Sequence, residues 1–202
     1  MKGKAMAWTQ KGRGQRRTPL LGVLLGLAVM GSAPQSWYSP GLHRIEQMTR
    51  YDWTLDDRQV IVYPLALELD FERAETTVWL YVGGERAPGK TRYFCPRGAS
   101  LRDGVRPTTL MLSRLEAAAI TTRKGRGECV AITPRREENV QAQARTLYDT
   151  VGTWRLRGED ARPLDPGQVG LVFLGLPHRE APYLAVTFPF GEEILFSTRD
   201  LQ

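Results

Sequence analysis

The sequence predicts a mainly β domain, a sandwich or barrel-like sheet with one amphipathic helix around residues 135–151. Short segments rich in β-branched and aromatic residues recur through the second half of the chain, and turns bearing Gly or Pro separate them. One segment departs from this pattern and has apolar residues at helical spacing. A basic and then apolar N-terminus sets the first residues apart as a signal segment.

The N-terminal segment has the three parts of a secretory signal. Residues 1–18 are basic and lack acids, Pro19 to Met30 form an apolar run, and small residues follow up to Ala33. A transmembrane helix needs roughly 20 apolar residues, more than this run provides. We therefore predict a signal peptide over residues 1–33, with an uncleaved anchor as the alternative. In either case the body lies outside the cytoplasm, in the periplasm or at the cell surface, and only an uncleaved leader contacts the membrane.

The body is predicted to begin with a linker over residues 34–41, because PQSWYSPG holds two Pro, two Ser and a final Gly. The remaining residues, 42–202, suit one globular domain.

The charge distribution argues against a nucleic-acid partner. The chain has 28 Lys and Arg, 22 Asp and Glu, and a formal net charge of +6. The basic excess lies in residues 1–33, so the remainder balances 22 basic against 22 acidic residues. A nucleic-acid binder needs surplus Lys and Arg to displace counterions from phosphates, and this body has none overall.

Strand signals begin with Val60 to Leu69, whose odd positions are all apolar. Pro64 lacks a backbone donor, which predicts a sheet edge or a bulge there. Thr77 to Val82 reads as a second strand that ends at a Gly pair. Thr109 to Thr122 fits either a helix or a strand, and its flanking threonine pairs favour a strand. Further strands are expected over Arg92 to Cys95, Cys129 to Thr133, Thr153 to Leu156, Val169 to Leu176, Tyr183 to Phe188 and Ile194 to Ser197.

The predicted helix covers Pro134 to Val151. Thr133 can cap its first turn, Pro134 suits the first helical position, and two Glu residues follow where the helix dipole favours acids. An apolar stripe lies on one face, and Gly152 follows as a stop signal. The stripe consists of Val140, Ala144, Leu147 and Val151.

The two cysteines, Cys95 and Cys129, are predicted to form a disulfide, because an even pair in an exported chain is typical of one. Two Cys and two distant His have no spacing suited to a zinc site. We expect neither a metal nor a cofactor.

Gly84 to Thr91, GERAPGKT, matches the spacing of a phosphate-binding loop. That loop needs a helix to begin at its Lys and Thr, so that helix amides face the phosphates. Here an aromatic, β-like segment follows, and Pro96 comes too early for a helix interior. We interpret the match as a Gly- and Pro-rich turn.

No group of residues identifies a reaction, so the catalytic residues stay unassigned. The leading hypothesis is a non-catalytic envelope domain that binds a partner protein or a cell-surface component. Its contacts are expected among the aromatic residues of the early body, which are typical of binding surfaces. These residues are Trp37, Tyr38, Tyr51 and Trp53.

Two alternatives remain open. One is a small secreted hydrolase that uses His178 or His43 with a carboxylate. The other is a carrier for a small ligand, which would need an enclosed apolar cavity.

Overall fold

The computed structural model describes residues 37–55, 58–84, 92–106, 113–132, 136–156 and 161–202. The chain divides into two units, Met1–Ala33 and Pro34–Gln202, and every described residue belongs to the second. The predicted signal segment and residues 85–91 of the segment that matches a phosphate-binding loop therefore lie outside the described residues. Within the described ranges, no helix has the length and hydropathy to cross a membrane.

Within the described residues the domain is mainly β with one α-helix, as the sequence predicts. A short 3-10 turn follows the helix (Val151–Thr153), and another follows the last strand (Thr198–Asp200). The helix and strands are β1 (Gly41–Arg44), β2 (Tyr51–Leu55), β3 (Arg58–Asp70), β4 (Glu75–Gly84), β5 (Arg92–Phe94), β6 (Ser100–Gly104), β7 (Ser113–Thr122), β8 (Gly125–Gly127), β9 (Val130–Ile132), α1 (Glu137–Asp149), β10 (Gln168–Leu174), β11 (Tyr183–Thr187) and β12 (Glu193–Ser197).

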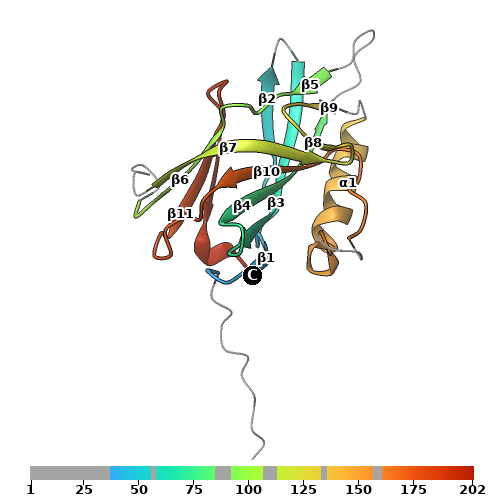
Figure 1. Cartoon of the computed structure of the whole chain (residues 1–202). Helices are drawn as coiled ribbons and strands as arrows, with labels where there is room; N and C mark the ends of the chain where they lie inside the picture. Colours follow the sequence, from blue (N-terminus) through green and yellow to red (C-terminus); the bar gives the residue numbers. More distant parts are fainter. Residues whose placement is uncertain (1–36, 56–57, 85–91, 107–112, 133–135, 157–160) are drawn as a thin grey trace, which may run out of the picture. The chain divides into compact units, whose positions relative to one another are not determined.

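Most strands form one antiparallel sheet that curls into a half-barrel (Figure 1). Its order is β1-β3-β4-β10-β7-β6-β11-β12, while β2 also pairs with β3 and β8 with β7. The segment after β12 returns to the start of the domain. There Arg44 and Gln202 exchange two main-chain hydrogen bonds of 2.8 and 2.9 Å, and Ile45 bridges to Leu201.

The inner face of this curled sheet holds the larger hydrophobic core, to which strands from β3 to β12 contribute. The bulge at Pro64 decides which residues of β3 point inward, because an extra residue reverses the alternation. Before the bulge Val60 and Val62 point into this core, and after it Leu67 and Leu69 do so. The bulge was predicted, but the strict alternation of odd residues on one face was not observed.

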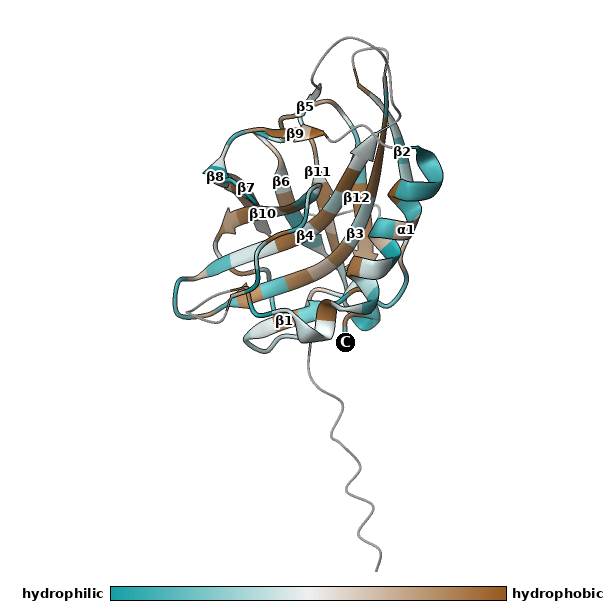
Figure 2. Ribbon diagram, turned by 90° about the vertical axis from the view of Figure 1, so that its right-hand side faces the viewer, coloured by the Kyte–Doolittle hydropathy of each residue, from teal (hydrophilic) through white to brown (hydrophobic). Residues whose placement is uncertain are grey.

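Helix α1 covers the outer face of β3 and β4, which carry mostly hydrophobic residues (Figure 2). Its buried stripe packs against Tyr63, Trp79 and Tyr81 of those strands. The apolar stripe thus has the role that the helical spacing predicts. At the start of the helix, Glu137 pairs with Arg50, which also binds Asp52 of β2.

The expected strand over Thr153 to Leu156 is wrong. Residues Val151–Thr153 form a 3-10 turn, and the chain after it pairs with no strand. Trp154 instead packs edge-on against Trp79, with ring centres 6.2 Å apart, and its indole N–H donates to the Thr150 hydroxyl at 3.2 Å. Burial of this ring against the end of α1 outweighs the local preference of its neighbours for a strand.

Two strand edges approach each other beside the inner core. The Tyr51 hydroxyl of β2 donates to the Leu195 carbonyl of β12 at 3.3 Å. Trp53, two residues on, is only 3% exposed and packs against Phe188 and Phe190 at 4.9 and 5.6 Å. Trp53 therefore contributes to the core, and Tyr51 joins the two edges of the curled sheet.

The contact between α1 and β4 leaves no room for a side chain at Gly83. A Cβ there would lie 2.7 Å from Val140 Cγ1, and the β-branched Val140 has little rotamer freedom in a helix. We expect Gly83→Ala to lower the free energy of unfolding by about 1–3 kcal/mol, measured by chemical denaturation. Gly152→Ala is the control, because a Cβ there meets nothing within 4 Å. Equal stability of the two variants would contradict the close approach.

Burial raises the pKa of Tyr51 and of Tyr63 above the ordinary tyrosine value. The folded state therefore keeps their protons while the unfolded chain ionises above about pH 10, so stability falls as the pH rises through this range. We expect Tyr51→Phe to lose less stability than the natural protein as the pH rises above about 10 in denaturation curves. An unchanged slope for Tyr51→Phe would contradict the role of this burial.

Candidate binding groove

Beside α1, the outer face of the sheet continues over β10, β7 and β8. Strand pairing shows which residues share this face, because paired residues point the same way. Trp79, on the helix side, pairs with Gly170, which pairs with Thr121, which in turn pairs with Arg126. These positions therefore face the same side as α1. The Trp79 ring fills the space above Gly170, where a Cβ would lie 2.8 Å from it.

A groove of about 660 Å³ lies at the end of this face. The β7–β8 hairpin forms one wall and the β5–β9 ribbon forms another. The start of β10, with the residues just before it, forms the third side. Three separate parts of the fold thus meet around one hollow.

Gln168, the first residue of β10, is only 1% exposed in the groove lining. Its Oε1 accepts from Arg162 Nη2 and from the Asp165 main-chain N–H, both at 3.2 Å. Arg162 is held in turn by the Asp165 carboxylate at 2.9 Å and by the Trp154 ring, 4.9 Å away. The Gln168 Nε2 has no hydrogen-bond partner among the described residues.

The β7–β8 turn brings positive charge to the opposite wall. Arg123 and Lys124 form its tip, and the Thr122 hydroxyl holds the turn by accepting from the Lys124 main-chain N–H at 3.2 Å. In the described part of the chain, neither tip side chain pairs with an acid. Arg126 also lines the groove, and its Nη2 forms a salt bridge with Glu75 Oε2 at 3.3 Å.

The ribbon wall is closed at its end by the two cysteines. Continuing the pairing of Phe94 with Val130 by one residue places Cys95 opposite Cys129. Their Cα atoms are 4.2 Å apart and their sulfur atoms lie at bonding distance, as the sequence predicted. A two-stranded ribbon alone is marginally stable, so this link fixes the wall. Tyr93 stands 63% exposed on it.

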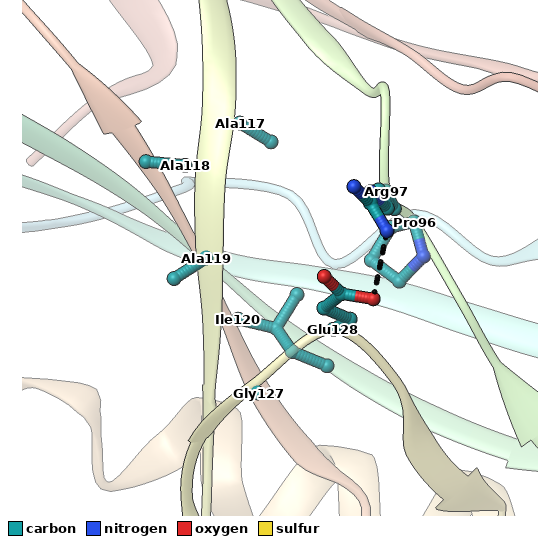
Figure 3. Close-up of a pocket in the computed structure, with 8 residues that line it drawn as sticks. All are labelled: Pro96, Arg97, Ala117, Ala118, Ala119, Ile120, Gly127 and Glu128. Carbon is teal, nitrogen blue, oxygen red and sulfur yellow. Dashed lines mark hydrogen bonds and ion pairs between the residues drawn. The ribbon is translucent and has the colours of Figure 1, made fainter.

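A second, smaller pocket of about 260 Å³ lies on the other side of β8. Ala117, Ala118 and Ala119 of β7 contribute to its lining, and Arg97 and Glu128 lie next to each other in it (Figure 3). Arg97 and Glu128 form a salt bridge of 3.1 Å. The larger groove therefore offers a ligand more unpaired charged groups than this pocket, whose two charged residues pair with each other.

The two histidines lie away from the groove lining. His43 is buried, and its Nε2 is 2.8 Å from the Ser39 carbonyl oxygen. His178 is exposed, and its Nδ1 accepts from the Glu180 main-chain N–H at 3.3 Å. Its own main-chain N–H donates to the Asp103 carboxylate. Within the described ranges no three His, Cys, Asp or Glu residues gather as metal ligands.

The early aromatic residues separate into two places. Trp37, Tyr38 and Phe71 form a partly exposed cluster at the β3–β4 turn, with neighbouring ring centres 5.2 and 5.3 Å apart. Tyr51 and Trp53 lie instead at the meeting of β2 and β12. A partner contact by Trp37, Tyr38 and Tyr51 stays a prediction.

Segment Arg92–Phe94, which directly follows the match to a phosphate-binding loop, is a strand. A phosphate-binding loop would open a helix at this point. The groove residues were not singled out from the sequence, because Arg123 and Lys124 read as an ordinary loop and Gln168 as a residue before a strand. The pairing of β7 with β10 brings them together.

No family model, curated protein or solved structure matches this chain.

Loss of the Cys95–Cys129 link should destabilise the domain. Closing a loop of this 34-residue separation contributes about 3–4 kcal/mol in the chain-entropy model. We expect the Cys95→Ala, Cys129→Ala double variant to lose about that much in chemical denaturation, and reductant should have no effect on it. Intact mass after alkylation gives the second measurement. Two alkylated thiols in the protein without reductant would contradict the link.

Proposed function

We propose that this chain is an exported, non-catalytic domain that binds an envelope protein or cell-surface component through the groove. The single observation that carries the proposal is the convergence of the β7–β8 hairpin, the β5–β9 ribbon and the start of β10 on one hollow. The basic and apolar leader and the cysteine pair support the location outside the cytoplasm.

The groove has the properties of a site formed before its ligand arrives. Its volume falls within the range of small-ligand sites, roughly 300–1,000 Å³, and it is open along one side. The cysteine link and the strand pairing hold its walls, which lowers the entropy cost of binding. Tyr93 offers an exposed aromatic ring, the kind of side chain that often contributes strongly to protein contacts.

The two alternative functions have less support in these residues. The hydrolase hypothesis needs a histidine at the site, and neither His43 nor His178 lines the groove. The carrier hypothesis needs an enclosed apolar cavity, whereas this groove is open and four charged residues belong to its lining. An open groove suits a segment of a larger partner.

Photo-crosslinking in living cells tests this proposal. A benzophenone amino acid at Tyr93 should form an adduct of defined mass in the envelope fraction, because the ring lies on the ribbon wall of the groove. The control carries the same amino acid at Val105, which is equally exposed, 64% against 63%, but outside the groove lining. Equal adducts at both positions, or none at Tyr93, would overturn the proposal.

A further inference from the structure

We propose that the groove recognises an oxyanion, a carboxylate or phosphate group of its ligand, between the Gln168 amide and the Arg123–Lys124 turn. This inference rests on the proposed function, because it names the chemistry that the same groove selects. It depends on three observations: the orientation of the Gln168 amide, the charges around it, and the strand register that aligns them.

The orientation of the Gln168 amide follows from its neighbours. An amide nitrogen and oxygen are told apart by their hydrogen-bond partners. Two donors, Arg162 Nη2 and the Asp165 main-chain N–H, bind one end of this amide, so that end is the oxygen. The other end is therefore the NH₂ group, a donor that has no partner among the described residues.

A buried donor without a partner costs free energy, about 1–3 kcal/mol. Gln168 cannot relieve this cost by turning, because its oxygen would then leave both Arg162 and Asp165. An acceptor that enters the groove beside Gln168 completes this arrangement. A ligand oxygen meets this requirement.

The surrounding charges select an anionic acceptor. The groove lining holds Arg123, Lys124 and Arg126 against one acid, Asp165. Asp165 forms a salt bridge with Arg162, and Glu75 forms a salt bridge with Arg126. The positive charge of the turn is therefore uncompensated within the described residues. Hydrogen bonds from such groups are stronger to a carboxylate or phosphate than to a neutral oxygen.

The strand register brings the donor and the cations together. Gly170 of β10 pairs with Thr121 of β7, and continuing this antiparallel register by two residues brings Gln168 level with Arg123. Residues two apart on a strand share a face, so Gln168 points to the side that Gly170 and Arg126 share. The amide and the turn thus border one end of the groove.

Fluorescence anisotropy with labelled chains tests this inference on the protein purified from the envelope fraction. The probes are oligoglutamate and short-chain polyphosphate, which separate the two sources of an oxyanion, and oligoglutamine is the neutral control. We expect at least one anionic probe to bind and oligoglutamine not to bind. Added salt should weaken the binding, since charges on the turn are exposed to solvent.

Three variants identify the groups involved. Gln168→Glu keeps an oxygen for Arg162 and Asp165 but replaces the donor by an anion, so affinity should fall about ten-fold or more. Lys124→Gln should weaken binding about two- to five-fold through loss of one exposed charge. The matched control is Arg145→Gln on α1, which removes the same charge outside the groove and should leave affinity unchanged.

Each outcome decides the inference. Binding of one anionic probe alone supports it and identifies the oxyanion, whereas equal binding of oligoglutamine overturns it. Equal affinity losses in Lys124→Gln and Arg145→Gln also overturn it, because they show attraction to overall charge. If Gln168→Glu fails to fold, the affinities of Lys124→Gln and Arg123→Gln for the anionic probes test the inference instead, since both residues lie on the exposed turn. A Tyr93 adduct without any anion binding leaves the proposed function standing and removes only this inference.

Discussion

Strands β3 and β4 are paired along most of their length and buried on both faces. One face contributes to the interior of the curled sheet, and the other holds α1. A strand pair covered on both sides has few alternatives in register, because a slip would expose apolar residues. The position of α1 follows from this pair, because its buried residues pack against the outer face of β3 and β4.

The parts of the fold that local sequence specifies were predicted well. The segments now seen as β4, β10, β11 and β12 are rich in β-branched and aromatic residues, and the stripe around Val140 and Leu147 indicates α1. Short strands such as β1, GLHR, and β6, SLRDG, were missed, because polar and glycine residues give no alternation to detect. They become strands only because neighbouring strands offer them hydrogen-bond partners. Trp154 shows the opposite effect, in which burial overrides local preference.

The only part of the candidate site that the sequence predicted was the disulfide between Cys95 and Cys129. The even number of cysteines in a chain with a predicted signal segment predicts their pairing, and this pairing closes the ribbon wall of the groove. The rest depends on contacts between residues far apart in sequence, such as Gln168 beside the turn at Arg123 and Lys124. No local pattern marks a glutamine whose oxygen is engaged and whose nitrogen is not. That property belongs to the packed loop around Arg162 and Asp165.

The pairing between Arg44 and Gln202 also has a consequence for the order of events in synthesis. These residues are 158 positions apart, yet they exchange main-chain hydrogen bonds at the same place in the sheet. The sheet cannot complete this corner until residue 202 has left the ribosome. Contacts of such long sequence separation also slow folding.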